Sequence, residues 1–151
     1  MRVVKGDLLS ATEGIIVHGC NCQGVMGSGV ALAIKNKYPD AYYDYINYVS
    51  VETDTSTRGR NLLGEIQYTK VTDKLTIANA FTQQFYGKDG LKYASYSAVE
   101  DIMYRLKDFT SLDTPIHMPK IGCGLGGLDW DEVSQYIQYY LGNHDVTVYE
   151  L

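Results

Sequence analysis

The sequence contains few cysteines: Cys20, Cys22 and Cys123 are the three among its 151 residues. An odd number of cysteines argues against the disulfide framework of a small secreted protein. The Cys-x-Cys spacing also lacks the paired Cys-x-x-Cys of structural zinc sites, and no His-x-x-x-His partner accompanies it. We therefore expect small buried thiols, no metal site and no cofactor.

The chain is also poor in cations and in long apolar runs. Thirteen Lys and Arg residues stand against 18 Asp and Glu, which gives a formal charge of −5. Because affinity for a nucleic-acid backbone comes mainly from cations that neutralise phosphates, we expect no general nucleic-acid binding. No stretch approaches the ~20 apolar residues of a membrane span, and the first residues lack a signal-peptide pattern. We expect a cytoplasmic protein with no membrane partner.

What the chain does contain is the pattern of one α/β domain over residues 1–151. With 45% apolar residues it can bury roughly two-thirds of its unfolded surface in one core. The β-branched runs predict strands at 1–5, 15–20, 64–71, 75–81, 115–121 and 146–151. Apolar residues at helical spacing predict helices at 30–38, 41–51, 93–109 and 129–141. This order predicts an α/β sandwich with a largely parallel central sheet.

Three local features complete this prediction. The polar segment 52–63 is typical of a surface loop. Asp129, with Glu132 three residues later, is placed to cap the last helix. Fourteen tyrosines, many of them in "YYDYINY" and "YIQYY", resemble a base-stacking surface, but they lack accompanying basic residues. We therefore interpret the tyrosines as half-buried helix faces.

Two glycine-rich segments, 24–29 and 122–127, each follow a predicted strand and precede a helix. Glycine allows positive φ and brings backbone amides close to a ligand, while the following helix N-terminus favours an anion. Two such loops at one sheet edge would clamp a diphosphate; the alternative is a pair of ordinary tight turns. "GCGLGG" lacks room for a complete dinucleotide-binding fold, and "GVMGSGVA" lacks the Lys-Ser or Lys-Thr of a P-loop.

Five segments together resemble the macrodomain family. They are "VKGDLL" at 4–9, "IVHGCNCQGVMGSGVALAI" at 16–34, "IANAFTQQ" at 77–84, "MPKIGCGLGGLDW" at 118–130 and the ending "VTVYEL". Within the family the chain is most similar to the yeast-type ADP-ribose 1″-phosphate phosphatase branch, which includes relatives of the terminal ADP-ribose glycohydrolase. The resemblance implies a macrodomain-like three-layer α/β/α sandwich with a mixed, largely parallel central sheet.

The resemblance also implies a set of ligand-binding residues. Asp7, with Leu8 beside it, matches the aspartate that accepts a hydrogen bond from the adenine amino group, and Tyr149 takes the place of a residue near adenine. Asn21 matches the asparagine that orients the distal ribose. Two phosphate loops are expected, with the residues Gly27, Ser28, Gly29 and Val30 in the first and Cys123, Gly124, Leu125, Gly126 and Gly127 in the second.

Departures from the family pattern narrow the expected chemistry. Many macrodomains have asparagine where this chain has His18, whereas the phosphatase branch has histidine. The glycohydrolase relative uses a lysine on the strand near Asn79 and Ala80 and an aspartate where Gly126 stands here. Without that lysine and aspartate, the lysine-based mechanism is disfavoured.

The expected activity is therefore removal of the 1″-phosphate from ADP-ribose 1″-phosphate, with His18 and Asn21 as the catalytic residues. Histidine titrates near neutrality and suits a general acid, general base or nucleophile; the alternative is a core histidine that only supports the loop. A cysteine nucleophile is disfavoured because no flanking cation lowers its pKa. The alternatives to a phosphatase are a non-catalytic ADP-ribose reader and a mono-ADP-ribosyl hydrolase. The expected partners are ADP-ribose, ADP-ribose 1″-phosphate or an ADP-ribosylated protein.

Overall fold

A computed structural model describes residues 1–87 and 89–150, which form a six-stranded sheet in the order β1-β6-β5-β2-β4-β3. The strands are β1 (Arg2–Lys5), β2 (Gly14–Asn21), β3 (Ile66–Lys70), β4 (Leu75–Gln83), β5 (Ile116–Pro119) and β6 (Val146–Glu150). Neighbouring strands are parallel except for β3, which pairs antiparallel with β4 in a hairpin. The prediction of a mixed, largely parallel sheet is confirmed.

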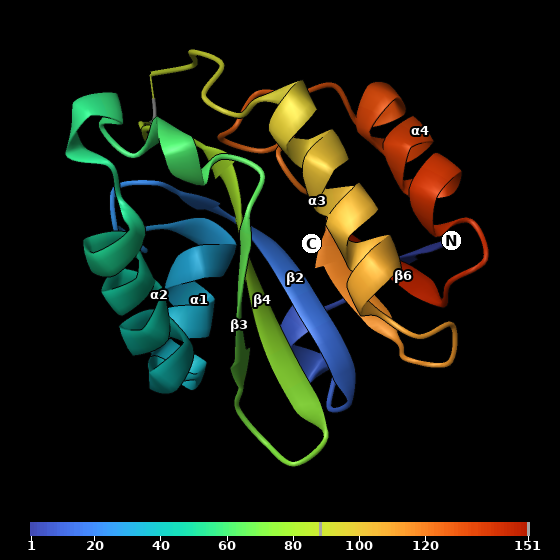
Figure 1. The fold of residues 1–151 in the computed structure, drawn as a ribbon. Coiled ribbons are helices and arrows are strands. Elements are labelled where there is room, and N and C mark those ends of the chain that lie inside the picture. The colour runs from blue at the N-terminus through green and yellow to red at the C-terminus, as the bar shows by residue number, and fades with distance from the viewer. Residues whose placement is uncertain (88, 151) are drawn as a thin grey trace.

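Helices cover both faces of the sheet (Figure 1). Helices α1 (Gly29–Lys37) and α2 (Pro39–Glu52) lie on one side, and α3 (Tyr96–Phe109) and α4 (Trp130–Leu141) lie on the other. This is the expected three-layer α/β/α sandwich. Among the described residues, none of the helices combines the length and the apolar character that a bilayer span requires.

The central strand β2 is buried on both faces, as its nearly continuous apolar sequence predicts. Successive side chains point to opposite faces of a sheet. Ile15 and Val17 pack with α3 and α4, whereas Ile16 packs with Ile34 of α1 and Ala41 of α2. This alternation places His18 on the α1 and α2 side of the sheet, below the end of the strand.

Segment 52–63 lies mostly at the surface, as predicted, but it is more ordered than a loop. It contains two short 3-10 helices, Thr55–Thr57 and Arg60–Leu62. Leu62 is fully buried and packs in a cluster with Tyr45 and Phe81, and the Asn61 side chain hydrogen-bonds the Asp54 amide at 3.0 Å and the Glu52 carbonyl at 2.9 Å. The polar composition of the segment did not indicate that Leu62 would be buried and would attach the segment to the core.

Caps set the starts of the two helices on the other face. Ser95 accepts a hydrogen bond from the Ala98 amide, so α3 begins at Tyr96 rather than at 93 as expected. Asp129 caps α4 as predicted and accepts from the Asp131 amide at 3.3 Å. The helices that flank the second glycine loop therefore have fixed starting points.

Candidate ligand-binding site

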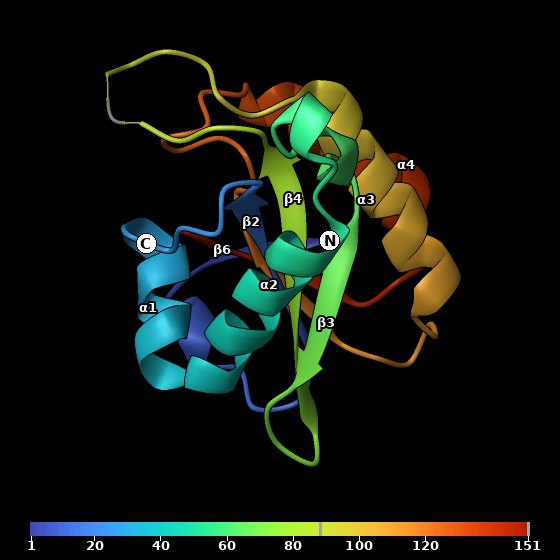
Figure 2. The ribbon, with the colours of Figure 1, turned by 60° about the vertical axis from the view of Figure 1, so that its left-hand side comes forward.

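The two glycine-rich loops lie at the same edge of the sheet. They follow β2 and β5, which are adjacent and parallel, so both leave the sheet at its carboxyl edge. Figure 2 shows the segments after β2, β4 and β5 at this end of the molecule. Ligands of open α/β sheets bind in this place because loops from neighbouring strands converge there.

The first loop ends at the N-terminus of α1, whose backbone amides are open. The Ser28 side chain makes no capping hydrogen bond. Gly29 has φ +59, and a Cβ added to it would meet no atom within 4 Å. In the part of the chain that the structure describes, the amides of Met26, Gly27 and Ser28 donate to no protein acceptor. Gly27 and Ser28 therefore have unpaired backbone N–H groups next to a positive helix end, an arrangement that favours an anion, whereas Met26 is buried. Val30 is half-buried and packs against the core beneath α1.

The second loop also exposes free amides. Gly124 and Leu125 are exposed, and a Cβ on Gly124 would meet open space. Across residues 1–87 and 89–150, no protein group accepts from the amides of Gly124, Leu125 or Gly126. The loop is closed by the Gly127 amide, which donates to the Gly124 carbonyl at 3.1 Å, and Gly127 has φ +81, where a side chain is strained. The free amides suit a second phosphate.

Gly126 also has a structural role that the sequence did not indicate. It is buried, and its carbonyl accepts from the amides of Tyr93 and Ala94 at 3.0 and 2.9 Å. A Cβ at Gly126 would lie 2.6 Å from the Gly122 carbonyl oxygen and 2.9 Å from the Ala94 Cβ. Gly126 thus fastens the second loop to the segment before α3, and its amide is the part left for a ligand.

Asn21, at the end of β2, is held by its own loop and by one residue of α2. Its Oδ1 accepts from the Gln23 and Val25 amides at 3.0 and 3.3 Å, and its Nδ2 donates to the Val25 carbonyl at 2.8 Å. The fully buried Tyr45 hydroxyl lies 2.9 Å from Asn21 Oδ1 and 2.7 Å from its backbone oxygen. Because Oδ1 is already occupied, Asn21 offers a ligand its second Nδ2 hydrogen, in one fixed orientation.

Two glutamines that the sequence did not mark tie the surrounding loops together. Gln23 Nε2 donates to the Arg58 carbonyl at 2.8 Å and to the Gln84 carbonyl at 3.1 Å. Gln84 Nε2 in turn donates to the Thr57 carbonyl at 3.1 Å. These bonds join the loop after β2, the 3-10 segment and the end of β4. No local pattern predicts them, because each partner is distant in the sequence.

The three residues expected near adenine differ in how accessible they are to a ligand. Asp7 is exposed just after β1; its Oδ1 accepts from the Leu9 amide at 2.9 Å, and its Oδ2 accepts from no described residue. Leu8 is 2% exposed and belongs to the core, so it supports the turn from below. Tyr149 is half-buried, and its hydroxyl pairs with His117 Nδ1 at 2.8 Å. β1 and β2 are three strand spacings apart, about 14 Å, which an extended ligand would have to span.

His18 belongs to a buried hydrogen-bond network rather than to an open cavity. Its Nε2 lies 2.5 Å from Asn79 Oδ1, and Asn79 Nδ2 donates to Gln67 Oε1 at 2.8 Å. Gln67 Nε2 then donates to Thr69 Oγ1 at 2.8 Å, and the Thr69 hydroxyl donates to Asp44 Oδ2 at 2.7 Å. Since the Asn79 oxygen only accepts, the network assigns the proton of His18 to Nε2. It connects β2, β4, β3 and α2.

Burial also keeps His18 uncharged. The side chain is fully buried, and loss of solvation lowers its pKa from 6.5 to about 4, although the bond to Asn79 opposes the shift. At neutral pH the ring is therefore a neutral donor to Asn79. This geometry supports the alternative of a core histidine that supports the site, and direct catalysis by His18 stays a prediction.

Sequence comparison agrees with this arrangement of strands and loops. A model of the Macro domain family matches residues 17–137, which include most of β2, both glycine loops and most of α4. The chain belongs to the Macro domain family. The family resemblance predicted from the five sequence segments is thereby confirmed.

Relatives of this macrodomain include two kinds of named enzyme. It is 28% identical to an ADP-ribose 1″-phosphate phosphatase of Debaryomyces hansenii, over 99% of this chain and 98% of that protein. It is 31% identical to a DNA ADP-ribosyl glycohydrolase of Thermus aquaticus, where the match covers 99% of this chain but 41% of the larger protein. The solved macrodomain of Thermus aquaticus DarG has a TM-score of 0.79 and 31% identity, with 99% of this chain and 97% of that chain covered.

The thiols of the macrodomain are poorly suited to act as nucleophiles. Burial raises the pKa of Cys20 well above its usual range and that of Cys22 to about 12. Cys123, half-buried in the second loop, has its pKa raised to about 11 by burial and by Asp129, and its Sγ lies 3.5 Å from the Ile121 carbonyl oxygen. All three are therefore thiols rather than thiolates at neutral pH, as the packing interpretation expects.

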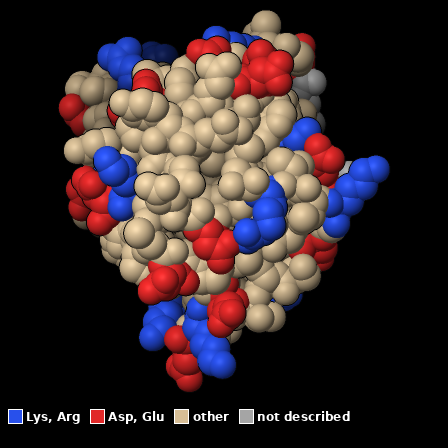
Figure 3. All heavy atoms as spheres, turned by 90° about the vertical axis from the view of Figure 1, so that its right-hand side faces the viewer, with Lys and Arg blue, Asp and Glu red and all other residues tan. Residues whose placement is uncertain are grey.

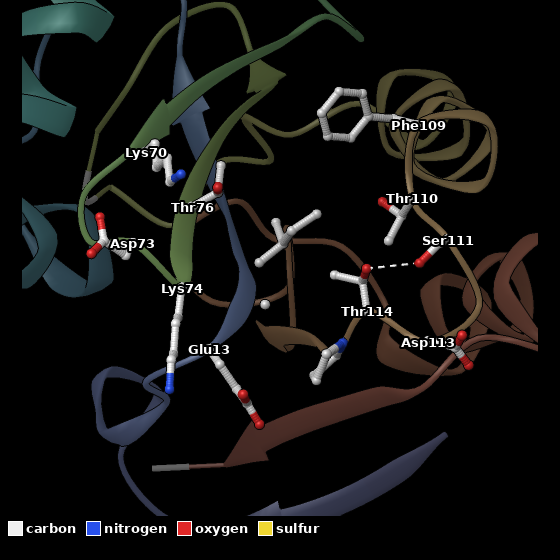
Figure 4. Close-up of a pocket in the computed structure, with 13 residues that line it drawn as sticks. Glu13, Lys70, Asp73, Lys74, Thr76, Phe109, Thr110, Ser111, Asp113 and Thr114 are labelled. Carbon is white, nitrogen blue, oxygen red and sulfur yellow. Dashed lines mark hydrogen bonds between the residues drawn. The ribbon is translucent and has the colours of Figure 1, made fainter.

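A hollow of about 670 Å³ lies at the opposite edge of the macrodomain's sheet. It is bounded by the starts of β2, β4 and β5 and by the end of α3. Figure 4 shows Lys70, Thr76 and Thr110 directed into it, with Asp113 directed outward. Its position at the amino edge separates it from both glycine loops, so we assign the ligand site to the carboxyl edge.

Proposed function

We propose that this macrodomain binds ADP-ribose and is a hydrolase that removes the 1″-phosphate from ADP-ribose 1″-phosphate. The observation that carries the proposal is the end-to-end match with the Debaryomyces hansenii phosphatase, which spans 99% of this chain and 98% of that protein. A match of this extent supports a common ligand and a related reaction.

The geometry of the carboxyl edge supports the same ligand. The free amides of the two glycine loops suit the two phosphates of a diphosphate. The second Nδ2 hydrogen of Asn21 suits a ribose hydroxyl, and the free Oδ2 of Asp7 suits the amino group of adenine. Along its length ADP-ribose carries the adenine first, then the diphosphate and last the distal ribose.

The proposed reaction adds water to phosphorus and breaks the bond between phosphorus and the 1″ oxygen, giving ADP-ribose and inorganic phosphate. Backbone amides near the transferred group would stabilise the negative charge of the transition state. His18 contributes by holding Asn79 and the end of β2 in place, and Asn21 by fixing the ribose.

The test combines phosphate release with calorimetry. Wild-type protein should release phosphate from ADP-ribose 1″-phosphate and bind ADP-ribose; Asn21→Ala should weaken binding about tenfold and reduce turnover more strongly. Asn143→Ala, an exposed substitution after α4, is the matched control and should change neither. Binding without phosphate release would reduce the proposal to an ADP-ribose reader, and absence of binding would overturn it.

A second candidate is hydrolysis of an ADP-ribosyl bond. It is favoured by the 31% identity with the Thermus aquaticus glycohydrolase and by the corresponding structural match. The lysine-based route is disfavoured, because Asn79 lies near the place where the resemblance puts the catalytic lysine. The Asn79 side chain is hydrogen-bonded to His18 and Gln67. Release of ADP-ribose from an ADP-ribosylated oligonucleotide, with no release of phosphate from ADP-ribose 1″-phosphate, would favour this candidate.

A further inference from the structure

The outer faces of α3 and α4 meet in a stripe of tyrosine and glutamate side chains, which we call the tyrosine seam. On each helix the members are spaced four residues apart, so they lie along one line of its surface. The seam consists of Tyr96, Glu100 and Tyr104 on α3 and Glu132, Tyr136 and Tyr140 on α4.

Contacts across the seam hold these side chains in fixed positions. The Tyr140 hydroxyl donates to Glu100 at 2.9 Å, and the Tyr136 hydroxyl donates to Glu132 at 2.8 Å. The rings of Tyr104 and Tyr140 meet edge to face at 6.1 Å between centroids, and those of Tyr96 and Tyr136 do so at 6.5 Å. Ordered aromatic side chains lose little entropy when a partner binds, which suits a recognition surface.

One tyrosine of the seam and a tyrosine next to the seam are exposed, and the other three seam tyrosines are half-buried. Tyr104 is 52% exposed, and Tyr139, which packs edge to face on Tyr140 at 4.8 Å, is 81% exposed. Figure 3 views the molecule from the α4 side, where a broad uncharged area covers the upper middle of the face and charged side chains of both signs lie below it and around the margins. Large exposed aromatic surface of this kind is typical of protein interaction sites.

The charge of the seam indicates the chemistry of its partner. In the described ranges 1–87 and 89–150, neither Glu100 nor Glu132 lies within 4.0 Å of a lysine or arginine nitrogen. The hydrogen bond to Glu132 is the main cause that raises the pKa of Tyr136 to about 12, and Glu100 raises it further. The carboxylates of Glu100 and Glu132 give this aromatic surface negative charge, which is complementary to a cation.

The molecule already places one cation on the seam. Lys92 Nζ lies 4.6 Å from the centroid of the Tyr96 ring, at the end next to the second glycine loop. Either lysine or arginine is attracted to the face of a tyrosine ring. Arginine can also stack its planar guanidinium on the ring and pair with a carboxylate through two hydrogen bonds. The rings of Tyr104 and Tyr140 carry no such cation within the part of the chain described.

We propose that the tyrosine seam is a docking surface for an arginine-bearing segment of a partner protein. Its guanidinium groups stack on the rings of Tyr104 and Tyr140 and pair with Glu100 and Glu132. Two seams facing each other would bring four glutamates together with two copies of Lys92, so a cationic partner complements the seam better than a second copy of this chain does. The inference is independent of ADP-ribose binding and of turnover.

The probe for the test is a fluorescein-labelled decapeptide of alternating glycine and arginine, followed by fluorescence anisotropy. The same peptide with citrulline in place of arginine is the uncharged control. Wild-type protein should bind the arginine peptide at least about tenfold more tightly than the citrulline peptide. Glu100→Gln and Tyr104→Ala should each weaken binding about fivefold, which corresponds to about 1 kcal/mol, whereas Tyr104→Phe keeps the ring and should stay within about twofold.

Matched controls separate specific docking from general attraction by an acidic protein. Tyr43 is 60% exposed on α2, and Glu52 is exposed at the end of that helix; Tyr43→Ala and Glu52→Gln should leave affinity within about twofold of wild type. Circular dichroism confirms that each variant is folded. Equal losses in the control variants, or failure of wild type to prefer the arginine peptide, would overturn the proposal. So would a concentration-dependent dimer in sedimentation that Tyr104→Ala dissociates.

Discussion

The substitution Tyr45→Phe removes one oxygen from the support of Asn21 and leaves the aromatic packing in place. The Tyr45 ring remains 5.8 Å from Phe81 between centroids, so no large cavity forms. What is lost is the hydroxyl that lies 2.7 Å from the Asn21 backbone oxygen and 2.9 Å from its Oδ1. The variant therefore isolates the orientation of Asn21 from the rest of the core.

The expected loss of stability follows from the acceptors left behind. Asn21 Oδ1 keeps two amide donors, from Gln23 and Val25, but the Asn21 backbone oxygen loses its buried hydroxyl partner. One lost hydrogen bond with a partly unsatisfied acceptor costs about 1–2 kcal/mol. For a domain of this size, that lowers the melting temperature by about 3–6 °C. Because Asn21 then loses one of the hydrogen bonds that fix its position, ADP-ribose affinity should fall about three- to tenfold.

Thermal denaturation followed by circular dichroism gives the stability, and calorimetric titration of ADP-ribose gives the affinity. Tyr48→Phe is the matched control: Tyr48 lies on the same helix and stacks on Phe81 at 5.7 Å, but its hydroxyl donates to Glu65. It should lose stability without losing affinity. If Tyr45→Phe binds ADP-ribose as tightly as wild type, or if Tyr48→Phe weakens binding equally, the assignment of Tyr45 as a positioning residue is refuted.

Three further predictions concern pH, the second loop and the thiols. Burial lowers the pKa of His18 from 6.5 to about 4. As pH falls, His18 is therefore protonated in the unfolded chain at a higher pH than in the folded protein, which favours the unfolded chain. The free energy of unfolding should fall by about 3 kcal/mol as pH drops from about 6.5 to about 4. Chemical denaturation across that range should show a shallower pH dependence in His18→Gln; an equal slope would contradict the assignment. Gly126→Ala, whose Cβ meets Gly122 at 2.6 Å and Ala94 at 2.9 Å, should lower stability by about 1–3 kcal/mol, whereas Gly124→Ala, whose Cβ meets open space, should not. Phosphate release should survive mild alkylation with iodoacetamide, and loss of activity after alkylation would restore a thiol mechanism. Phosphate release should also continue in EDTA; activity that is lost in EDTA and recovered with a divalent ion would show that a metal is required.

The elements predicted from sequence were those in which local signals agree with the fold. β-branched runs located the strands, and Asp129 located the start of α4, because these signals act over a few residues. The prediction for segment 52–63 missed its attachment to the core, because the buried Leu62 anchors it although ten of its twelve residues are polar or glycine. The start of α3 was misplaced because the cap at Ser95 was not distinguished from the residues before it.

The sequence by itself determined the α/β class, the two glycine loops after strands and the family, because strand periodicity and the order of small residues are local properties of the chain. It did not determine what His18 and Asn21 touch. Only the tertiary structure places His18 against Asn79, 61 residues away, and the Tyr45 hydroxyl on Asn21. It also brings two separate tyrosine patterns together on α3 and α4. Each of these contacts depends on sheet register and helix packing, which set side-chain partners across the fold rather than along the chain.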